Sequence, residues 1–438
     1  MLVECMKRLA RQGGIAPALW KADIDSAYRR IPLKPEHRWA AWSAFVVAGV
    51  TMVSGHLTMP FGAVAAVHAW NRVGALLAHI ARCVLLTPVL RFVDDFFSVD
   101  HPECVQHAME CFARIVRALL GVSAIADKKL EYGCPLVVLG LNFESNVERV
   151  RVWPTQDKLD KWSGRIRDAL DTGFLKPGMA SKLAGALNWA SQHVFHRLGR
   201  AMLRPLYRHQ TCKGGRVGQH LRLCLEWWLE VMNLDLGQCC EFGEDTRDVV
   251  ELFCDARGHP ARLAAVIYVD NECFYTDWAP PEPLLQNFKA RRDNQIMGLE
   301  LLAIALGLST FETLLQGRRV RIWSDNVGGE AAMRKGSAKE FDHNCIVHCI
   351  WLRAAAHKMA LLIERVASKL NIADLPSRED YRVLEEMGAV WRRPFLDEPF
   401  WRPQVGNLFR SRHIRNRTNP FLPPFPQAWE SLSLLYKD

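Results

Sequence analysis

The sequence predicts an α+β protein of several domains, and three observations support this fold class. A chain of 438 residues is too long for one ordinary core. Short strand-like runs alternate with helical patterns over residues 1–150 and again over 249–378, whereas 155–236 has helical patterns alone. Hydrophobic residues make up 49% of the chain and aromatic residues 10%, which is enough for separate cores. We place the domains at 1–150, 151–246, 247–380 and 381–438.

Two adjacent aspartates, Asp94 and Asp95, are the most informative local feature of the first region. Apolar residues flank them on both sides within 91–97, which predicts a buried hairpin with two like charges at its tip. Like charges beside an apolar floor repel each other and lose hydration, and a bound cation is the usual compensation. Upstream, Asp23 ends a strand-like stretch and Tyr28 follows five residues later. A solvated turn would explain a lone Asp-Asp pair equally well, so the surrounding motifs matter.

Five motifs occur in an order that resembles the palm of reverse transcriptases. They are Asp23 with Tyr28, Met-Pro-Phe-Gly at 59–62, Phe-Val-Asp-Asp at 92–95, Asp-Lys-Lys at 127–129 and Val-Leu-Gly-Leu at 138–141. The Pro-Phe-Gly form resembles LTR and DIRS-like tyrosine-recombinase retrotransposons more than retroviruses. The resemblance implies an RNA-directed DNA polymerase whose partners are an RNA template, a DNA primer, deoxynucleoside triphosphates and other parts of the element's polyprotein.

By this resemblance, Asp23 and Asp94 bind two Mg²⁺ ions, with Mn²⁺ as an alternative, Asp95 supports them, and the carbonyl of Ile24 is a further ligand. Mg²⁺ prefers hard carboxylate and phosphate oxygens, and two ions suit an in-line displacement at phosphorus. The implied substrate-binding residues are Tyr28 under the sugar of the nucleotide, Phe61 and Gly62 behind the templating base pair, Lys128 or Lys129 beside the pyrophosphate, and Leu139 and Gly140 in the primer grip. A core role for Tyr28 and a solvated turn for the lysines remain alternatives.

A second acidic set lies downstream. Asp255 and Asp325 each end a strand-like run, Glu300 interrupts an apolar helical pattern, and Asp374 lies near the end of the region. Aspartates at strand ends and helix caps are common without any function. A carboxylate on an apolar helix face, however, is costly without a cation or partner.

The βββαβαβα order with Asp, Glu, Asp and Asp resembles a ribonuclease H domain. The resemblance implies that all four acids are catalytic and bind two metal ions, with water as the nucleophile and the RNA strand of an RNA–DNA hybrid as the substrate. Many relatives carry a histidine just before the last acidic segment, and this chain has Arg365 there. A contribution of that histidine to product release is therefore not expected here.

Together the two resemblances imply a right-hand polymerase palm with truncated fingers, a helical thumb or connection, and an α/β ribonuclease H-like domain. Only twenty-two residues precede Asp23, so we expect poor polymerisation by the chain as written. Two alternatives stay open. One is a hybrid ribonuclease with a dead polymerase, and the other is a non-catalytic nucleic-acid-binding remnant.

The middle of the chain carries a basic pattern. One long helix is expected from 179 to 207, despite Pro205, and four arginines recur on it at helical spacing. They predict a phosphate-facing stripe or an ordinary solvated face. Residues 237–248 are expected to be a linker, and the Arg-rich tail to have little structure of its own. The four arginines are Arg197, Arg200, Arg204 and Arg208.

Composition narrows the class of protein further. A formal net charge of +9 suits a polyanionic partner. The longest apolar run is too short for a membrane span and the first residues lack a signal-peptide pattern, so we expect neither membrane association nor secretion. The thirteen cysteines lack framework spacing, which favours the cytoplasm or nucleus. The His/Cys cluster at 343–349 superficially resembles a zinc site, but helix packing is the expected explanation.

Overall fold

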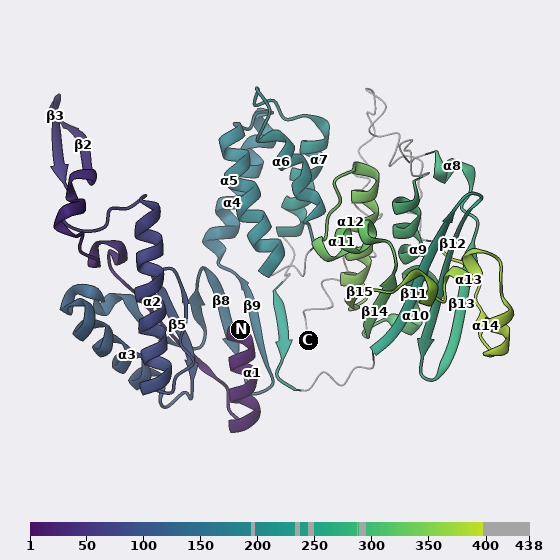
Figure 1. Ribbon diagram of the computed structural model, residues 1–438, viewed down its shortest axis with the longest axis horizontal. Helices are drawn as coiled ribbons and strands as arrows, with labels where there is room; N and C mark the ends of the chain where they lie inside the picture. Colours follow the sequence, from purple (N-terminus) through teal and green to yellow (C-terminus); the bar gives the residue numbers. More distant parts are fainter. Residues whose placement is uncertain (194–197, 233–236, 244–248, 287, 289–294, 397–438) are drawn as a thin grey trace. The chain divides into compact units, whose positions relative to one another are not determined.

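The computed structural model describes residues 1–193, 198–232, 237–243, 249–286, 288 and 295–396 (Figure 1). These residues form a mixed α+β structure with four sheets, so the α+β fold class is confirmed. The chain divides into two compact units, Met1–Thr155 with Gln238–Glu244, and Gln156–Gly237 with Asp245–Asp438. Arg197 and residues 397–438 of the predicted tail lie outside the described residues. The described start of that tail is more ordered than expected, because Arg382–Glu386 forms a helix and Val390–Trp391 a strand. No described helix has the length and apolarity needed to cross a membrane.

The described residues of the first unit form thirteen helices and strands, together with short 3-10 turns. They are α1 (Leu2–Gly13), β1 (Ala18–Asp23), β2 (Trp42–Val47), β3 (Val50–Gly55), α2 (Val64–Val84), β4 (Leu90–Phe92), β5 (Asp95–Asp100), α3 (Val105–Leu120), β6 (Leu130–Gly133), β7 (Leu136–Val138) and β8 (Leu141–Ser145), followed by β9 (Arg149–Pro154) and β10 (Gln238–Glu241).

The main sheet of this unit has the order β4-β5-β1-β6, and all its neighbouring strands are antiparallel. Helix α3 covers it because its apolar residues recur every three or four positions and form one face. Phe112 on that face packs against Trp20 of β1 and Phe96 of β5, with ring centroids 5.1 and 5.0 Å away. This core fixes the ends of β1 and β5, where the acidic residues lie.

Two further sheets complete the unit. The order β10-β9-β8-β7 corrects the expected linker, because Gln238–Glu241 pairs with β9 instead of forming a free connection. The predicted boundary at 150 also falls inside β9. Strands β2 and β3 form a separate two-stranded hairpin that projects from the unit (Figure 1), and every residue in both strands is exposed.

The second unit begins with helices and continues into a larger sheet. Its elements are α4 (Gln156–Thr172), α5 (Pro177–His193), α6 (Arg204–His209), α7 (Gln219–Met232), β11 (Val249–Gly258), β12 (Ala261–Val269), β13 (Glu272–Trp278), α8 (Glu282–Leu285), α9 (Ile296–Thr310), α10 (Glu312–Leu315), β14 (Arg319–Ser324), α11 (Val327–Lys335), α12 (Phe341–Ala356), β15 (Ala360–Arg365), α13 (Asp374–Ser377), α14 (Arg382–Glu386) and β16 (Val390–Trp391).

The single helix expected over 179–207 is wrong. Helix α5 ends at His193, and α6 begins only at Arg204 with Pro205 in its first turn. Between them Gly199 has a φ of +83°, and a Cβ there would lie 2.6 Å from the Trp228 ring. The tight contact with an indole therefore requires a residue without a side chain at this bend.

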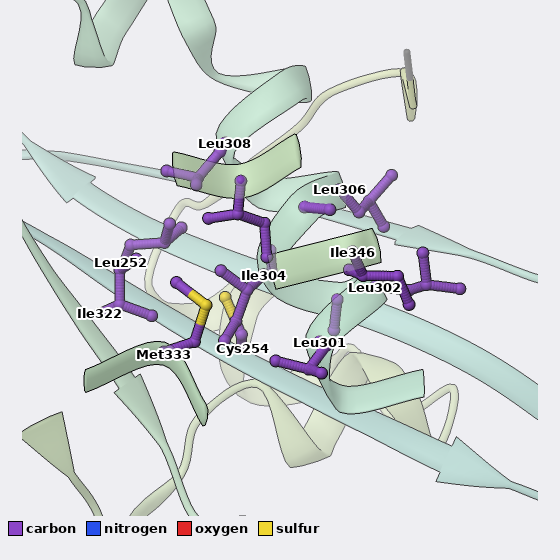
Figure 2. Close-up of a cluster of buried hydrophobic side chains, with 14 of the residues drawn as sticks. Leu252, Cys254, Leu301, Leu302, Ile304, Leu306, Leu308, Ile322, Met333 and Ile346 are labelled. Atoms are coloured by element: carbon purple, nitrogen blue, oxygen red, sulfur yellow. The ribbon is translucent and has the colours of Figure 1, made fainter. Parts of the chain in front are cut away.

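The six-stranded sheet has the order β15-β14-β11-β12-β13-β16. The pairs β11–β12 and β12–β13 are antiparallel, whereas β11–β14, β14–β15 and β13–β16 are parallel. Helix α9 lies on one face, and its residues from Gly298 to Ser309 are all buried (Figure 2). At Gly307 a Cβ would meet the Ala265 Cβ at 3.0 Å, so the helix approaches the sheet closely. The helix is apolar all round, and Glu300 is its one ionisable residue.

Candidate functional site

The parallel strands β11 and β14 set up the second acidic cluster. Their last paired residues are Phe253 and Trp323, whose rings stack with centroids 5.9 Å apart. Two residues beyond each of them comes an aspartate, Asp255 on β11 and Asp325 after β14. The carboxyl ends of neighbouring parallel strands lie at the same edge of a sheet, so these two side chains meet there.

Glu300 joins the two aspartates from α9. One carboxylate oxygen of each residue lies within 4.8 Å of the others, and within the described ranges this is the one such set of three acidic, His or Cys side chains. Asp255 and Glu300 are 5% and 4% exposed, and Asp325 is half-buried. We call Asp255, Glu300 and Asp325 the carboxylate triad.

Asp374, the fourth predicted acid, lies beside the triad but not within it. It begins α13, and its charge contributes to the raised pKa values of both Asp255 and Glu300. Arg378, one turn further on, donates from Nε to an Asp374 carboxylate oxygen at 2.7 Å. Asp374 therefore has a counter-ion of its own at the rim of the triad.

Burial and like charge dominate the electrostatics of the triad. Burial, followed by the charges of Asp255 and Asp325, raises the pKa of Glu300 to about 9. Burial also raises the pKa of Asp255 to about 6, against a lowering by a hydrogen bond from Ser377. At neutral pH Glu300 thus retains its proton, because three charges this close together in a dry site are unfavourable.

Two residues that position Asp255 were not identified from the sequence. Ser377 Oγ donates to Asp255 Oδ2 at 2.6 Å, and Asn371 Nδ2 donates to the Cys254 carbonyl at 3.0 Å and to Asp255 Oδ1 at 3.4 Å. Both lie close to Asp374 in the sequence, one on each side of it. Their position three residues either side of it was the only available signal.

The triad has the donors that a hard divalent cation requires. Its ligands are carboxylate oxygens alone, which suit Mg²⁺ or Mn²⁺ better than soft metals. Glu300 Oε2 is buried and has no hydrogen-bond partner among the described residues, an arrangement that is costly unless a cation or proton satisfies it. The residues present therefore fit a metal centre.

The predicted polymerase acids come together in the first unit. Asp23 at the end of β1 and Asp95 at the start of β5 are direct cross-strand partners. The Ile24 amide donates to the Asp94 carbonyl at 3.1 Å, which brings Asp94 to the same strand end. Burial, followed by the charges of Asp23 and Asp94, raises the pKa of Asp95. We call these three residues the hairpin cluster.

A lysine is already present at the hairpin cluster. The Lys129 ammonium contacts the Asp23 carboxylate, and this hydrogen bond raises the pKa of Lys129. Its charge also lowers the pKa of Asp95, against the larger effect of burial. Lys128, the other lysine of the predicted pair, is exposed. The structure thus brings one member of the pair to the acids.

The turn that presents Asp94 and Asp95 has an uncommon backbone. Val93 has a φ of +55°, which is unfavourable for a β-branched residue. The Trp70 indole of α2 donates to the Val93 carbonyl at 2.7 Å and holds this conformation. The expectation of a buried hairpin is only partly right, because Phe92 is 61% exposed. The sequence carried no signal for Val93 or Trp70.

The other predicted substrate-binding residues are more dispersed. The Tyr28 ring meets the exposed Phe61 ring edge-on, with centroids 5.4 Å apart, and Tyr28 packs on the core of the first unit. Gly62 has a φ of +88° beside them. Leu139 and Gly140 form the turn between β7 and β8 and so belong to a different sheet from the hairpin cluster.

Comparisons with known proteins gave structural neighbours alone. No protein-family model matches the chain, and no curated protein is similar to it. It is similar to a foamy viral protease-reverse transcriptase in complex with RNA/DNA hybrid, with 13% identity over 80% of this chain and 44% of that one and a TM-score of 0.38. It is also similar to the dRH form in complex with ds DNA, with 13% identity over 80% of this chain and 57% of that one and a TM-score of 0.39. For the protease-reverse transcriptase in complex with dsDNA, the identity is 14% over 80% of this chain and 68% of that one, with a TM-score of 0.37. The chain spans about half the length of the first two of these proteins.

Proposed function

We propose that the second unit is a metal-dependent nuclease of ribonuclease H type, which hydrolyses the RNA strand of an RNA–DNA hybrid within a retrotransposon reverse transcriptase. The carboxylate triad is the observation that carries this proposal. Three acids in a dry site, one with an unpartnered oxygen, require positive charge to ionise together. A phosphodiester substrate with divalent cations meets that requirement.

The residues of the chain have separate tasks in this reaction. Ser377 and Asn371 hold Asp255 in one orientation, so that its oxygens keep a fixed direction. Glu300 loses its proton to solvent when positive charge arrives, because only that charge offsets its burial. Two Mg²⁺ ions, when bound, would activate the attacking water and stabilise the leaving oxygen. Arg378 holds Asp374 at the rim of the triad.

The test is cleavage of a labelled RNA–DNA hybrid by the full chain with Mg²⁺. We expect Glu300→Gln to slow cleavage by about a thousandfold or more, since several kcal/mol of charge stabilisation is lost. Glu272→Gln, an exposed position on β13, is the matched control and keeps full activity. Cleavage that persists in EDTA or in Glu300→Gln would remove the proposal.

A second candidate function is RNA-directed DNA polymerisation by the first unit. It is favoured by the convergence of Asp23, Asp94 and Asp95 at one strand end and by the strained Val93 beside them. Strain of this kind concentrates at functional sites. The reaction would again use two divalent ions, with a deoxynucleoside triphosphate as the substrate.

Primer extension on an RNA template separates the two functions. We expect any extension to disappear in Asp94→Asn and to survive Glu300→Gln, whereas hybrid cleavage follows the opposite pattern. Extension that is unaffected by Asp94→Asn would exclude the hairpin cluster as its site. Loss of both activities from Asp94→Asn in a folded protein would contradict two independent sites.

A further inference from the structure

The second unit contains a cavity that the nuclease does not use. It has a volume of about 360 Å³ and is lined by α6, its preceding turn η5 (Ala201–Leu203), the start of α7 and the two residues Lys339 and Asn344. No residue of the carboxylate triad lines it. Cavities of this size are typical of sites for small molecules.

The charge of the lining is one-sided. Its described side chains include four permanent cations and no carboxylate. Like charges gathered around one hollow repel each other, and an anion in the hollow relieves that repulsion. The four are Arg204, Arg208, Arg216 and Lys339.

One of the four cations is hydrogen-bonded into the wall of the cavity, and the other three are exposed. Arg204 Nε donates to the Ala338 carbonyl at 2.9 Å, and Asn344 ties Ala338 to Ala201 through both ends of its amide. Arg208, Arg216 and Lys339 are exposed, and none forms an ion pair with a described carboxylate. Thus part of the predicted arginine stripe is structural, and Arg208 is the member available to a ligand.

The floor of the cavity is apolar. Met202, Leu221 and Cys224 line it and are buried, with Pro205 beside them. Burial, together with the charge of Arg208, lowers the pKa of the lining His220 to about 4, so this imidazole is neutral at pH 7. A cationic rim over an apolar floor suits a ligand with an anionic group and an apolar face.

We propose that this cavity binds a nucleotide, with its phosphate at Arg208, Arg216 and Lys339 and its base or sugar against the apolar floor. A free nucleotide and a nucleotide unit of a nucleic-acid strand present the same chemistry. The guanidinium groups are suited to phosphate because they donate several hydrogen bonds in one plane. The proposal makes no use of the carboxylate triad and stands whether or not the nuclease activity does.

Cys212 offers a direct readout. It lines the cavity and is exposed, so a ligand there should slow its alkylation. The full chain is treated with a maleimide reagent, and the modification of Cys212 is followed by peptide mass spectrometry. Exposed Cys83 in the first unit is the internal reference. The probes are AMP, a short single-stranded oligonucleotide and inorganic phosphate.

We expect AMP or the oligonucleotide to slow Cys212 modification about tenfold at ten times its dissociation constant, with Cys83 unchanged. Protection by AMP identifies a free nucleotide as sufficient, and protection by the oligonucleotide alone identifies a strand. The double variant Arg208→Gln/Lys339→Gln should lose most of the protection. Lys213→Gln, in the neighbouring loop but outside the lining, should keep it. Equal protection by inorganic phosphate, protection that survives the double variant, or no protection at all would overturn the proposal.

Discussion

The two acidic clusters of this chain both lie at strand ends but differ in how their charge is balanced. The carboxylate triad is largely buried, and among the described residues it is the proton on Glu300 that prevents three negative charges from lying side by side. The hairpin cluster is more open, with the Asp23 side chain 31% exposed, and Lys129 already supplies a cation. Two clusters with the same number of carboxylates can therefore differ in how strongly they depend on a bound metal ion for charge balance. The drier cluster should depend on it more.

The largest expected effect is the response to Mn²⁺ in the absence of nucleic acid. At a hundred times its dissociation constant, an ion that binds only the folded state stabilises it by about 2.7 kcal/mol. We expect this stabilisation to appear as slower hydrogen exchange in β11 and α9, with little change in β1 and β5. Glu300→Gln should abolish the response, and Glu272→Gln should retain it. Equal protection of both clusters would break the comparison.

The next effect is a pH dependence of the metal-free protein. Glu300 has a folded pKa of about 9 against an ordinary 4.5, so above about pH 5 its carboxyl ionises in the unfolded chain but keeps its proton in the folded one. The free energy of unfolding of the second unit therefore falls as pH rises from about 5 to 9. Asp255 adds a smaller fall of the same sign up to about pH 6.

Urea unfolding in EDTA, followed by tryptophan fluorescence, measures this dependence. Glu300→Gln removes the titrating group, so it should flatten the profile. At pH 8 it should stabilise the second unit by about 1–3 kcal/mol, because the cost of burying the new amide offsets part of the gain. Parallel profiles for the variant and the parent protein would show that Glu300 is not protonated at neutral pH.

A smaller effect is expected from Ser377→Ala. The change removes the hydrogen bond to Asp255 and should cost about 1 kcal/mol of stability. Because that bond lowers the pKa of Asp255, its loss should move the acidic limb of the hybrid-cleavage profile to higher pH. Ser368→Ala, at an exposed position, is the control. An unmoved limb in Ser377→Ala would mean that Asp255 does not set it.

The smallest effect is expected at Lys129, and it sharpens the comparison. Both members of the Lys129–Asp23 pair are substantially exposed, so Lys129→Gln should change stability by less than about 1 kcal/mol. Without its resident cation, the hairpin cluster should bind Mn²⁺ up to about fivefold more tightly, which would appear as new exchange protection in β1 and β5. Lys128→Gln should have no such effect. An equal gain in Mn²⁺ affinity in both variants would instead show that the loss of any nearby positive charge is sufficient.

Local patterns predicted the elements that carry the two clusters. The strands expected to end at Asp23 and Asp325 correspond to β1 and β14, because an apolar run acts over a few residues. The break at Gly199 and the pairing of β10 with β9 were missed. One depends on contact with an indole and the other on a strand about ninety residues earlier.

The same distinction applies to the sites. The acids were identifiable because charge among apolar residues is unusual in any fold. Asn371, Ser377 and Trp70 were not, since a polar or aromatic side chain is ordinary until its partner is known. Nor could the sequence separate Arg204, in the wall of the cavity, from Arg208, at its rim. That distinction depends on contacts of α6 with residues far along the chain.

The β2–β3 hairpin has a consequence for how the purified protein behaves in solution. Its strands contain no charged residue, and Trp42, Val46 and Val53 are each more than 60% exposed. Two free strand edges beside apolar faces favour pairing between copies, while the net charge of +9 keeps the copies apart. Salt screens that repulsion, so light scattering should show larger particles as ionic strength rises, and Val46→Lys should suppress them. Salt would then have opposite effects on the two associations of this chain, since it strengthens self-association and weakens the binding of a polyanion.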